Sequence, residues 1–258
     1  MLTSAVALCS LALHCLTAAT GRARSAGLAP ADTLTVFAAS DLALAFNEIG
    51  PLFEKERGAA VRFVFGSTGN LVLQIRHGAP ADVVFAANVS YVDQLRNEGL
   101  LSSGTQQLYA RGRIVLATLT TSGLTPKTLR ELIGPAFRKV AVANPEHAPY
   151  GLAAKQAMEH ETLWEDLKPK IVFAESIRQT LQFLQSGAVD AAVIALSVAQ
   201  PPEVRYVPID EALYQPIDQA LAVLKEAKQP GLARAFVAFV LGRTGRDILT
   251  RYGFLVPR

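Results

Sequence analysis

The stretch LTVFAASDLALAFNEIGPLFEKERG, residues 34–58, decides the fold class because its periodicity changes part-way along. Residues 34–40 are apolar or small, which predicts a buried strand. After them, apolar side chains recur at the spacing of an amphipathic helix, at Leu42, Phe46, Ile49 and Phe53. Gly58 then ends the pattern, as glycine commonly does at a helix C-terminus. The stretch therefore predicts a strand, a tight turn and a helix.

The same pattern returns further along the chain. AVRFVFGSTGN (60–70) leads into LVLQIRHG (71–78), and DVVFAANVS (82–90) leads into YVDQLRNEG (91–99). Each of these helical segments also ends at a glycine. Strands that alternate with helices indicate βαβ units and a mostly parallel sheet, so an α/β fold is expected.

A second α/β group follows the first. It begins with the strand candidate RIVLATL (113–119) and continues through further strands and helices, one of them starting at Gly151. We predict two α/β lobes, the first formed by residues 32–112 plus 220–258 and the second by 113–219. The chain is expected to cross between them along two hinge strands, Ile114–Leu119 and Ala220–Leu224. Ligands of open α/β sheets bind at the C-terminal ends of strands, which places the predicted site between the lobes.

The N-terminal segment differs from the rest. MLTSAVALCSLALHCLTAAT is largely apolar, too short to span a bilayer, and followed by small residues. This composition predicts a secretory signal peptide over about residues 1–25, and hence an exported, periplasmic protein. Both cysteines, Cys9 and Cys15, lie in this segment, so the mature chain is expected to contain neither a disulfide nor a thiolate site.

The overall composition narrows the class of partner. Half of the 258 residues are hydrophobic and 18% are charged, which is typical of a well-packed globular protein. The net charge of +3 is not concentrated in any basic stretch, and this argues against nucleic-acid binding.

The predicted strand-to-helix turns share a chemistry. They are AASD (38–41), GSTGN (66–70), EHAPYG (146–151) and AESIRQ (174–179). They contain hydroxyl groups, small residues and the N–H groups of helix first turns, which lack partners within the helix and bind anions. None contains lysine, and the basic residues in them are His147 and Arg178. Neutral donors suit a fully ionised oxyanion, which only accepts hydrogen bonds.

Two alternatives remain open for these turns. Ser or Asp before a helix often acts only as an N-cap, so each turn taken alone can be structural. A protonated oxyanion such as hydrogen phosphate also needs an acceptor, and Asp41 is a candidate for that role.

Four blocks of the chain resemble one known family. They are VFAASDLALAFNEI (36–49), FVFGSTGNLVLQIRHGAPADVVFAAN (63–88), VAVANPEHAPYGLAAKQAM (140–158) and RYGFLVP (251–257). In this order they resemble the periplasmic molybdate-binding proteins of ABC importers, over nearly the whole mature chain. The resemblance implies the type II periplasmic-binding-protein fold, closure of two lobes around molybdate or tungstate, and a monomer that delivers its cargo to an inner-membrane ABC permease. The anion is then cargo, with no cofactor and no direct side-chain ligand to the metal.

The resemblance also implies a set of binding residues, namely Ser40, Asp41 through its amide, Ser67, Thr68, Tyr150 and Ile177 through its N–H. A tyrosine that some members supply later in the chain is replaced here by Ala195, so the Tyr150 hydroxyl is expected to take over that contact. The Asp41 carboxylate would repel a dianion, and we expect it to cap the helix and face away. His147 is expected to make structural hydrogen bonds within its turn.

Other functional classes fit less well. FGSTGN lacks the G-x-S-x-G spacing of a nucleophile turn and the Lys-Ser/Thr of a P-loop, so we expect no enzyme and no catalytic residues. The cluster around His160 places its acids irregularly and is expected to be a solvated helix end. Receptors for sulfate or phosphate remain the alternatives within the anion class.

Overall fold

The computed structural model describes residues 33–257. The predicted signal peptide and both cysteines lie outside these residues. Two mixed five-stranded sheets form the framework, with strand orders β2-β1-β3-β10-β4 and β7-β6-β8-β5-β9. The predicted α/β fold with two sheets is confirmed.

The first sheet is built from β1 (Thr33–Ala39), β2 (Ala60–Gly66), β3 (Val83–Ala86), β4 (Gln107–Gly112) and β10 (Ile217–Val223). β1 pairs in parallel with β2 and β3, whereas β10 is antiparallel to β3 and β4. Alternate residues of β1 enter different cores, because successive side chains of a strand point to opposite faces.

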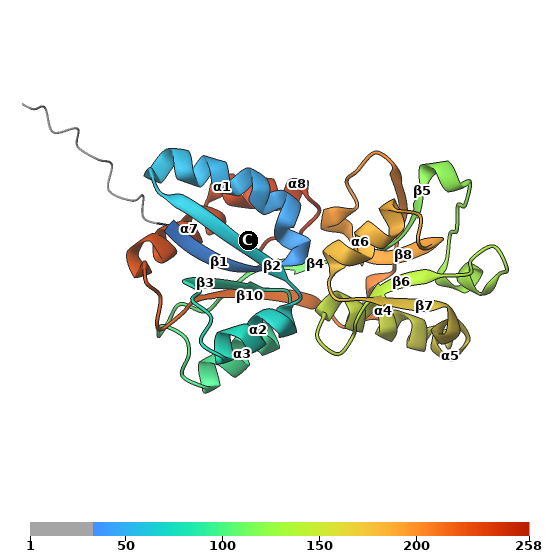
Figure 1. The fold of residues 1–258 in the computed structure, drawn as a ribbon, viewed down its shortest axis with the longest axis horizontal. Coiled ribbons are helices and arrows are strands. Elements are labelled where there is room, and N and C mark those ends of the chain that lie inside the picture. Colours follow the sequence, from blue (N-terminus) through green and yellow to red (C-terminus); the bar gives the residue numbers. More distant parts are fainter. Residues whose placement is uncertain (1–32, 258) are drawn as a thin grey trace, which may run out of the picture. The chain divides into compact units, whose positions relative to one another are not determined.

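Helices cover both faces of this sheet (Figure 1). α1 (Ala43–Arg57), α7 (Pro230–Leu241) and α8 (Arg243–Arg251) pack on one face, and α2 (Thr68–Arg76) and α3 (Val89–Asn97) on the other. Phe46 is the centre of the first of these cores, with Phe85 and Phe236 in edge-on contact at 4.9 and 5.8 Å between ring centroids. Such edge-to-face pairs add to the energy of apolar burial.

The second sheet consists of β5 (Ile114–Leu119), β6 (Val140–Ala143), β7 (Ile171–Ala174), β8 (Ala191–Ala195) and β9 (Val204–Pro208). The main helices against it are α4 (Pro149–His160), α5 (Trp164–Leu167) and α6 (Ile177–Gln185). Short 3-10 turns complete the fold; two of them, η1 (Ser40–Leu42) and η5 (Leu196–Val198), contact each other beside the site.

The chain passes from the first sheet to the second after β4 and returns to the first sheet at β10. β4 ends in the first sheet at Gly112 and β5 begins in the second at Ile114. The chain is back in the first sheet at Ile217, which pairs with Gly112. β5 and β10 each have a neighbouring strand on both sides, so the crossings are the short links before them rather than the strands. The second crossing precedes the lobe border predicted at 219/220; the lobe borders themselves stay a prediction.

Helix ends follow the predicted signals. Gly58, Gly78 and Gly99 all adopt the left-handed backbone conformation that ends a helix, with φ of 65°, 81° and 72°. α4 begins two residues earlier than predicted, with Pro149 at its first position, where the missing N–H of proline costs nothing. Among the described residues, no helix is both long and apolar enough to cross a membrane.

Candidate oxyanion-binding site

The six predicted binding residues lie around one small pocket. Its lining includes Ser40, Asp41, Ser67, Thr68, Tyr150 and Ile177. Each of them is at most 5% exposed. The first four come from the ends of β1 and β2 in the first sheet, and the last two from helix starts in the second. The free space at the centre is about 10 Å³, roughly the room that one water molecule needs, so in this conformation the pocket has no room for an amino acid or a sugar.

Three helix starts leave backbone donors at the pocket. Thr68 and Ile177 are the first residues of α2 and α6, and Tyr150 is the second of α4. N–H groups at these positions have no acceptor within their own helix, and none of the described residues outside the helix accepts from them. The helix dipole adds partial positive charge at the same points. The pocket therefore presents N–H donors from both sheets.

The side-chain hydroxyls of Ser67 and Thr68 do not cap α2. Ser67 occupies the N-cap position of α2 but makes no side-chain cap hydrogen bond. Its Oγ lies 2.9 Å from Nδ1 of His147. A proton on Nδ1 makes His147 the donor and leaves the Ser67 hydroxyl proton for an anion, whereas a proton on Nε2 alone, which faces Glu175, makes Ser67 the donor to His147. Thr68 Oγ1 accepts from the N–H of Ala87 at 2.9 Å, which leaves its own proton free as well.

His147 makes a hydrogen bond within its turn, as predicted, from its N–H to the carbonyl oxygen of Asn144 at 3.3 Å, and the turn at residues 144–149 also reaches across to the first sheet. The carbonyl oxygen of His147 accepts from Gly69 N–H at 2.9 Å. Its Nε2 lies 3.6 Å from a carboxylate oxygen of Glu175, which also accepts from Asn70 at 3.4 Å. A side chain at Gly69 would place its Cβ 2.8 Å from His147 Cβ and 2.9 Å from the carbonyl oxygen. Glycine is needed here for the close approach of two backbones.

Asp41 is placed differently from the prediction. Its carboxylate makes no helix-cap hydrogen bond, because η1 separates it from α1, whose N-cap is Leu42. Instead Oδ2 accepts from the Tyr150 hydroxyl and from Nε2 of Gln219, both at 2.8 Å. Burial is the main cause that raises the pKa of Asp41 to about 6, against the lowering effect of these hydrogen bonds.

The hydroxyl of Tyr150 is therefore engaged inside the protein. It donates to Asp41 and lies 2.8 Å from Nε2 of Gln219, so its proton does not point to an anion. The prediction that this hydroxyl contacts the ligand is not supported by its hydrogen bonds. The backbone N–H of Tyr150 remains as the donor from this residue.

Gln219, Ser197 and Tyr109 belong to the same network, and sequence reasoning missed them. Gln219 is fully buried in β10, and its Oε1 accepts from the hydroxyl of Tyr109. Ser197 donates to the carbonyl oxygen of Asp41 at 2.8 Å from the second sheet. The available signal for Gln219 was its place directly before the apolar run ALAVL (220–224) in a predicted strand.

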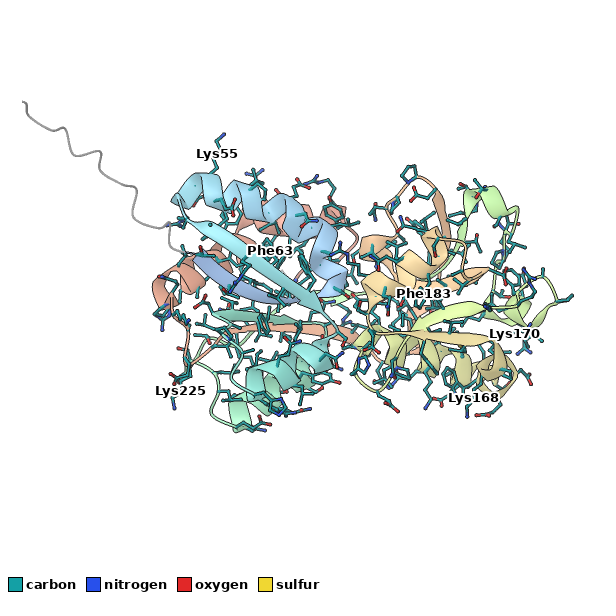
Figure 2. All side chains as sticks on the ribbon, in the orientation of Figure 1. Lys55, Phe63, Lys168, Lys170, Phe183 and Lys225 are labelled. Atoms are coloured by element: carbon teal, nitrogen blue, oxygen red, sulfur yellow. The ribbon has the colours of Figure 1, made fainter. Side chains whose placement is uncertain are left out.

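None of the residues that line the pocket is a lysine or an arginine. Arg178 is exposed, and its contact with the site is its backbone N–H, 3.4 Å from Ser40 Oγ. Figure 2 shows the labelled lysines, Lys55, Lys168, Lys170 and Lys225, at outer parts of the two sheets rather than at their junction. Within residues 33–257, no cluster of three or more His, Cys, Asp or Glu side chains could hold a metal ion.

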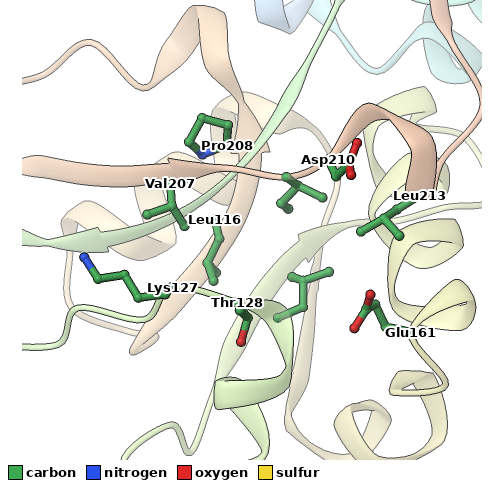
Figure 3. Close-up of a pocket in the computed structure, with 10 residues that line it drawn as sticks. Leu116, Lys127, Thr128, Glu161, Val207, Pro208, Asp210 and Leu213 are labelled. Atoms are coloured by element: carbon green, nitrogen blue, oxygen red, sulfur yellow. The ribbon is translucent and has the colours of Figure 1, made fainter.

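A larger cavity of about 220 Å³ lies elsewhere, beside β5 and β9 (Figure 3). Leu116, Val207 and Leu213 give it an apolar wall, and Lys127 lies on the other side of it from the acids Glu161 and Asp210 (Figure 3). Charges of both signs around an apolar wall do not match a bare oxyanion. None of the predicted binding residues lies there.

Comparison with known proteins shows to which family this chain belongs. A family model described as bacterial extracellular solute-binding protein matches residues 34–255. The chain belongs to this family. Among relatives, the molybdate-binding protein ModA of Azotobacter vinelandii is 33% identical, and the alignment covers 95% of this chain and 98% of that protein. The molybdate-binding protein ModA of Rhodobacter capsulatus is 32% identical, and the alignment covers 81% of this chain and 82% of that protein.

A solved structure shows the same similarity. The periplasmic molybdate-binding protein of Azotobacter vinelandii superposes with a TM-score of 0.82 at 30% identity, over 87% of this chain and all of that one. The predicted resemblance and the predicted fold class are therefore confirmed. The named relatives are binding proteins of this family rather than enzymes.

Replacing Ser67 with alanine is expected to weaken oxyanion binding by roughly 10- to 100-fold, since a hydrogen bond to a charged group contributes about 1.5–3 kcal/mol. The fold should be unaffected, because Ser67 does not cap α2 through its side chain. Titration calorimetry with molybdate measures the loss. Ser186→Ala, at the far end of α6, is the matched control. An unchanged affinity in Ser67→Ala would remove this hydroxyl from the site.

Replacing Tyr150 with phenylalanine should destabilise the protein in a pH-dependent way. The variant leaves the buried Asp41 carboxylate with one donor fewer, which costs about 1–3 kcal/mol when the group is charged. The folded pKa of Asp41 lies above its unfolded value, so the group is charged in both states at pH 8 and neutral in the folded state below about pH 6. Urea unfolding should show a larger loss at pH 8 than at pH 5. Equal losses would contradict the assigned contact.

Proposed function

We propose that the protein is an extracytoplasmic receptor that binds molybdate, and tungstate with it, in the pocket between its two sheets. The observation that carries the proposal is the convergence of neutral donors from helix starts of both sheets on a pocket without a cation. The names of the relatives, which are molybdate-binding proteins, support the same cargo.

Neutral donors are suited to a fully ionised tetrahedral oxyanion. Such an anion offers only acceptors, so N–H and hydroxyl groups satisfy it completely. Helix N-termini supply partial positive charge without a fixed cation. Selection of molybdate or tungstate over sulfate then rests on the size of the cavity, since all three ions share shape and charge.

A receptor for sulfate or phosphate is the second candidate. One observation favours phosphate. Asp41 lies in the pocket lining, and its Oδ1, which has no hydrogen-bond partner of ordinary geometry among the described residues, is available to accept a hydrogen bond from a protonated oxyanion. A dianion that brings no proton cannot donate a hydrogen bond to an ionised Asp41.

The proposed mechanism is closure of two lobes, 32–112 with 220–258 and 113–219, about the short crossings that precede β5 and β10. The anion favours the closed state because it contacts donors of both lobes only there. The closed, monomeric receptor then delivers its cargo to an ABC permease of the inner membrane. Removal of residues 1–25 as a signal peptide and a periplasmic location complete the proposal.

A thermal-shift series tests the cargo. Purified mature protein is compared with molybdate, tungstate, sulfate and phosphate. A ligand at a hundred times its Kd adds about 2.7 kcal/mol, or roughly 5–10 °C in Tm for a chain of this size. Shifts with molybdate and tungstate alone support the proposal. A shift with phosphate alone changes the cargo, and no shift with any of the four ions contradicts an oxyanion receptor.

A further inference from the structure

Asp41 is an acidic side chain in the lining of a pocket built for anions. It is 1% exposed and lies at the start of η1, directly after β1. Both of its strong side-chain hydrogen bonds go to Oδ2. Oδ1 is buried and makes no hydrogen bond of ordinary geometry among residues 33–257, although the backbone N–H groups of Asp41 and Leu42 lie near enough to the carboxylate to lower its pKa. A buried, unpartnered carboxylate oxygen is unfavourable unless something else satisfies it.

The network around Asp41 fixes which oxygen can carry a proton. Tyr109 donates to Oε1 of Gln219, so the amide nitrogen of Gln219 faces Asp41 and donates to Oδ2. Tyr150 donates to the same oxygen. Oδ2 therefore accepts two hydrogen bonds, one from Gln219 and one from Tyr150. A proton bound by this carboxyl group has its place on Oδ1.

No cation offsets the charge of Asp41. Burial is the largest cause of its raised pKa, of about 6, and the opposing causes are hydrogen bonds from Gln219, Tyr150 and backbone N–H groups. The titratable groups that face it are two buried tyrosines, Tyr109 from β4 and Tyr150 from α4, whose own pKa values burial raises well above 10.0. From α6 the charged residue is the exposed Arg178, and η5 presents Ser197, which has no charge.

Several charged side chains of the adjoining helices form ion pairs that do not involve Asp41. On α1 Glu48 pairs with Arg251, on α2 Arg76 pairs with Glu98, and on α4 Lys155 pairs with Glu159. His147, next to α4, contacts Ser67 and Glu175. The ionised carboxylate therefore meets a bound dianion without an intervening positive side chain, and two like charges in a buried site repel strongly.

On the premise that this pocket binds an oxyanion, as proposed above, we propose that Asp41 makes binding proton-linked: one proton lies between Oδ1 of Asp41 and an oxygen of the bound anion. The proton converts the repulsion into a hydrogen bond and satisfies the unpartnered oxygen. Below about pH 6 it is already on Asp41, and above that pH it is taken from solvent when the anion binds. Arrival of the proton on the anion gives the same bound state. Asp41 is thereby a specificity residue that favours anions able to share a proton.

Calorimetry with molybdate between pH 6 and pH 9 tests this proposal, since molybdate itself stays fully deprotonated in that range. Titrations in buffers of different ionisation enthalpy give the number of protons taken up. We expect about one proton per anion at pH 8, and an association constant that falls by up to about 10-fold per pH unit as the pH rises. Asp41→Asn should show neither the proton uptake nor the slope.

The control is Ser67→Ala, which should bind more weakly at every pH but keep the slope, because it leaves Asp41 in place. Wild-type binding with no proton uptake and no pH dependence overturns the proposal while the receptor function stands. A slope that persists in Asp41→Asn also overturns it. No binding of molybdate, tungstate, sulfate or phosphate at any pH overturns the receptor function instead. If Asp41→Asn does not fold, the proton count of the wild-type protein decides the question alone.

Discussion

Replacing Gly69 with alanine should weaken oxyanion binding by roughly 10- to 100-fold, which corresponds to about 1.4–2.7 kcal/mol. The added Cβ would lie within 3.0 Å of three atoms of His147, two of them backbone atoms that cannot rotate away. Gly69 donates to the His147 carbonyl across the pocket, so the two turns would have to separate. Calorimetric titration with molybdate measures the effect on Kd.

The matched control for this variant is Gly231→Ala. Both glycines are the second residue of a helix, α2 for Gly69 and α7 for Gly231, but a Cβ at Gly231 meets nothing within 4 Å. Alanine also has the higher helix propensity, so neither variant should lose stability within its helix. If Gly69→Ala binds like the control, the close approach of the two turns does not matter for the anion.

Replacing Gly151 with alanine should lower the free energy of unfolding by about 3 kcal/mol. Gly151 is the third residue of α4, and its added Cβ would lie 2.0 Å from the carbonyl oxygen of Ala143 and 2.6 Å from its carbonyl carbon. Both are backbone atoms at the end of β6, so α4 itself would have to shift. The corresponding fall in Tm is roughly 6–12 °C for a chain of this length.

Urea unfolding of Gly151→Ala, with Gly231→Ala again as control, measures this loss. A shift of α4 also displaces the Tyr150 N–H and the contact of Tyr150 with Asp41, so molybdate affinity should fall together with stability. A variant as stable as the wild type would show that the start of α4 is loosely packed against β6.

Local sequence was sufficient for much of the framework. The change from a strand pattern to a helix pattern predicted β1 and α1, and the glycines at 58, 78 and 99 marked the ends of their helices. These features depend on side-chain spacing and backbone conformation within a few residues, which the sequence displays directly. The turns of the pocket were predicted in the same way, because helix starts are local features too.

Contacts between distant segments were the part that local sequence could not supply. β4 and β9 were not predicted, since each is half-exposed in part and has no clear alternation. The partners of Asp41 lie 109 and 178 residues further along the chain, in Tyr150 and Gln219. Repulsion from the anion suggested that Asp41 faces away, and only the three-dimensional network shows that its carboxylate stays beside the pocket.

The central claim is that neutral donors of both sheets hold one oxyanion, and a crystal structure of the protein with molybdate tests it most directly. We expect one anion per chain, with oxygens about 2.7–3.2 Å from the hydroxyls of Ser40 and Ser67 and from the N–H groups of Tyr150 and Ile177. We also expect no lysine or arginine side chain in contact with the anion. An anion bound beside Lys127 in the larger cavity, or held in the pocket by the guanidinium group of Arg178, would contradict this claim.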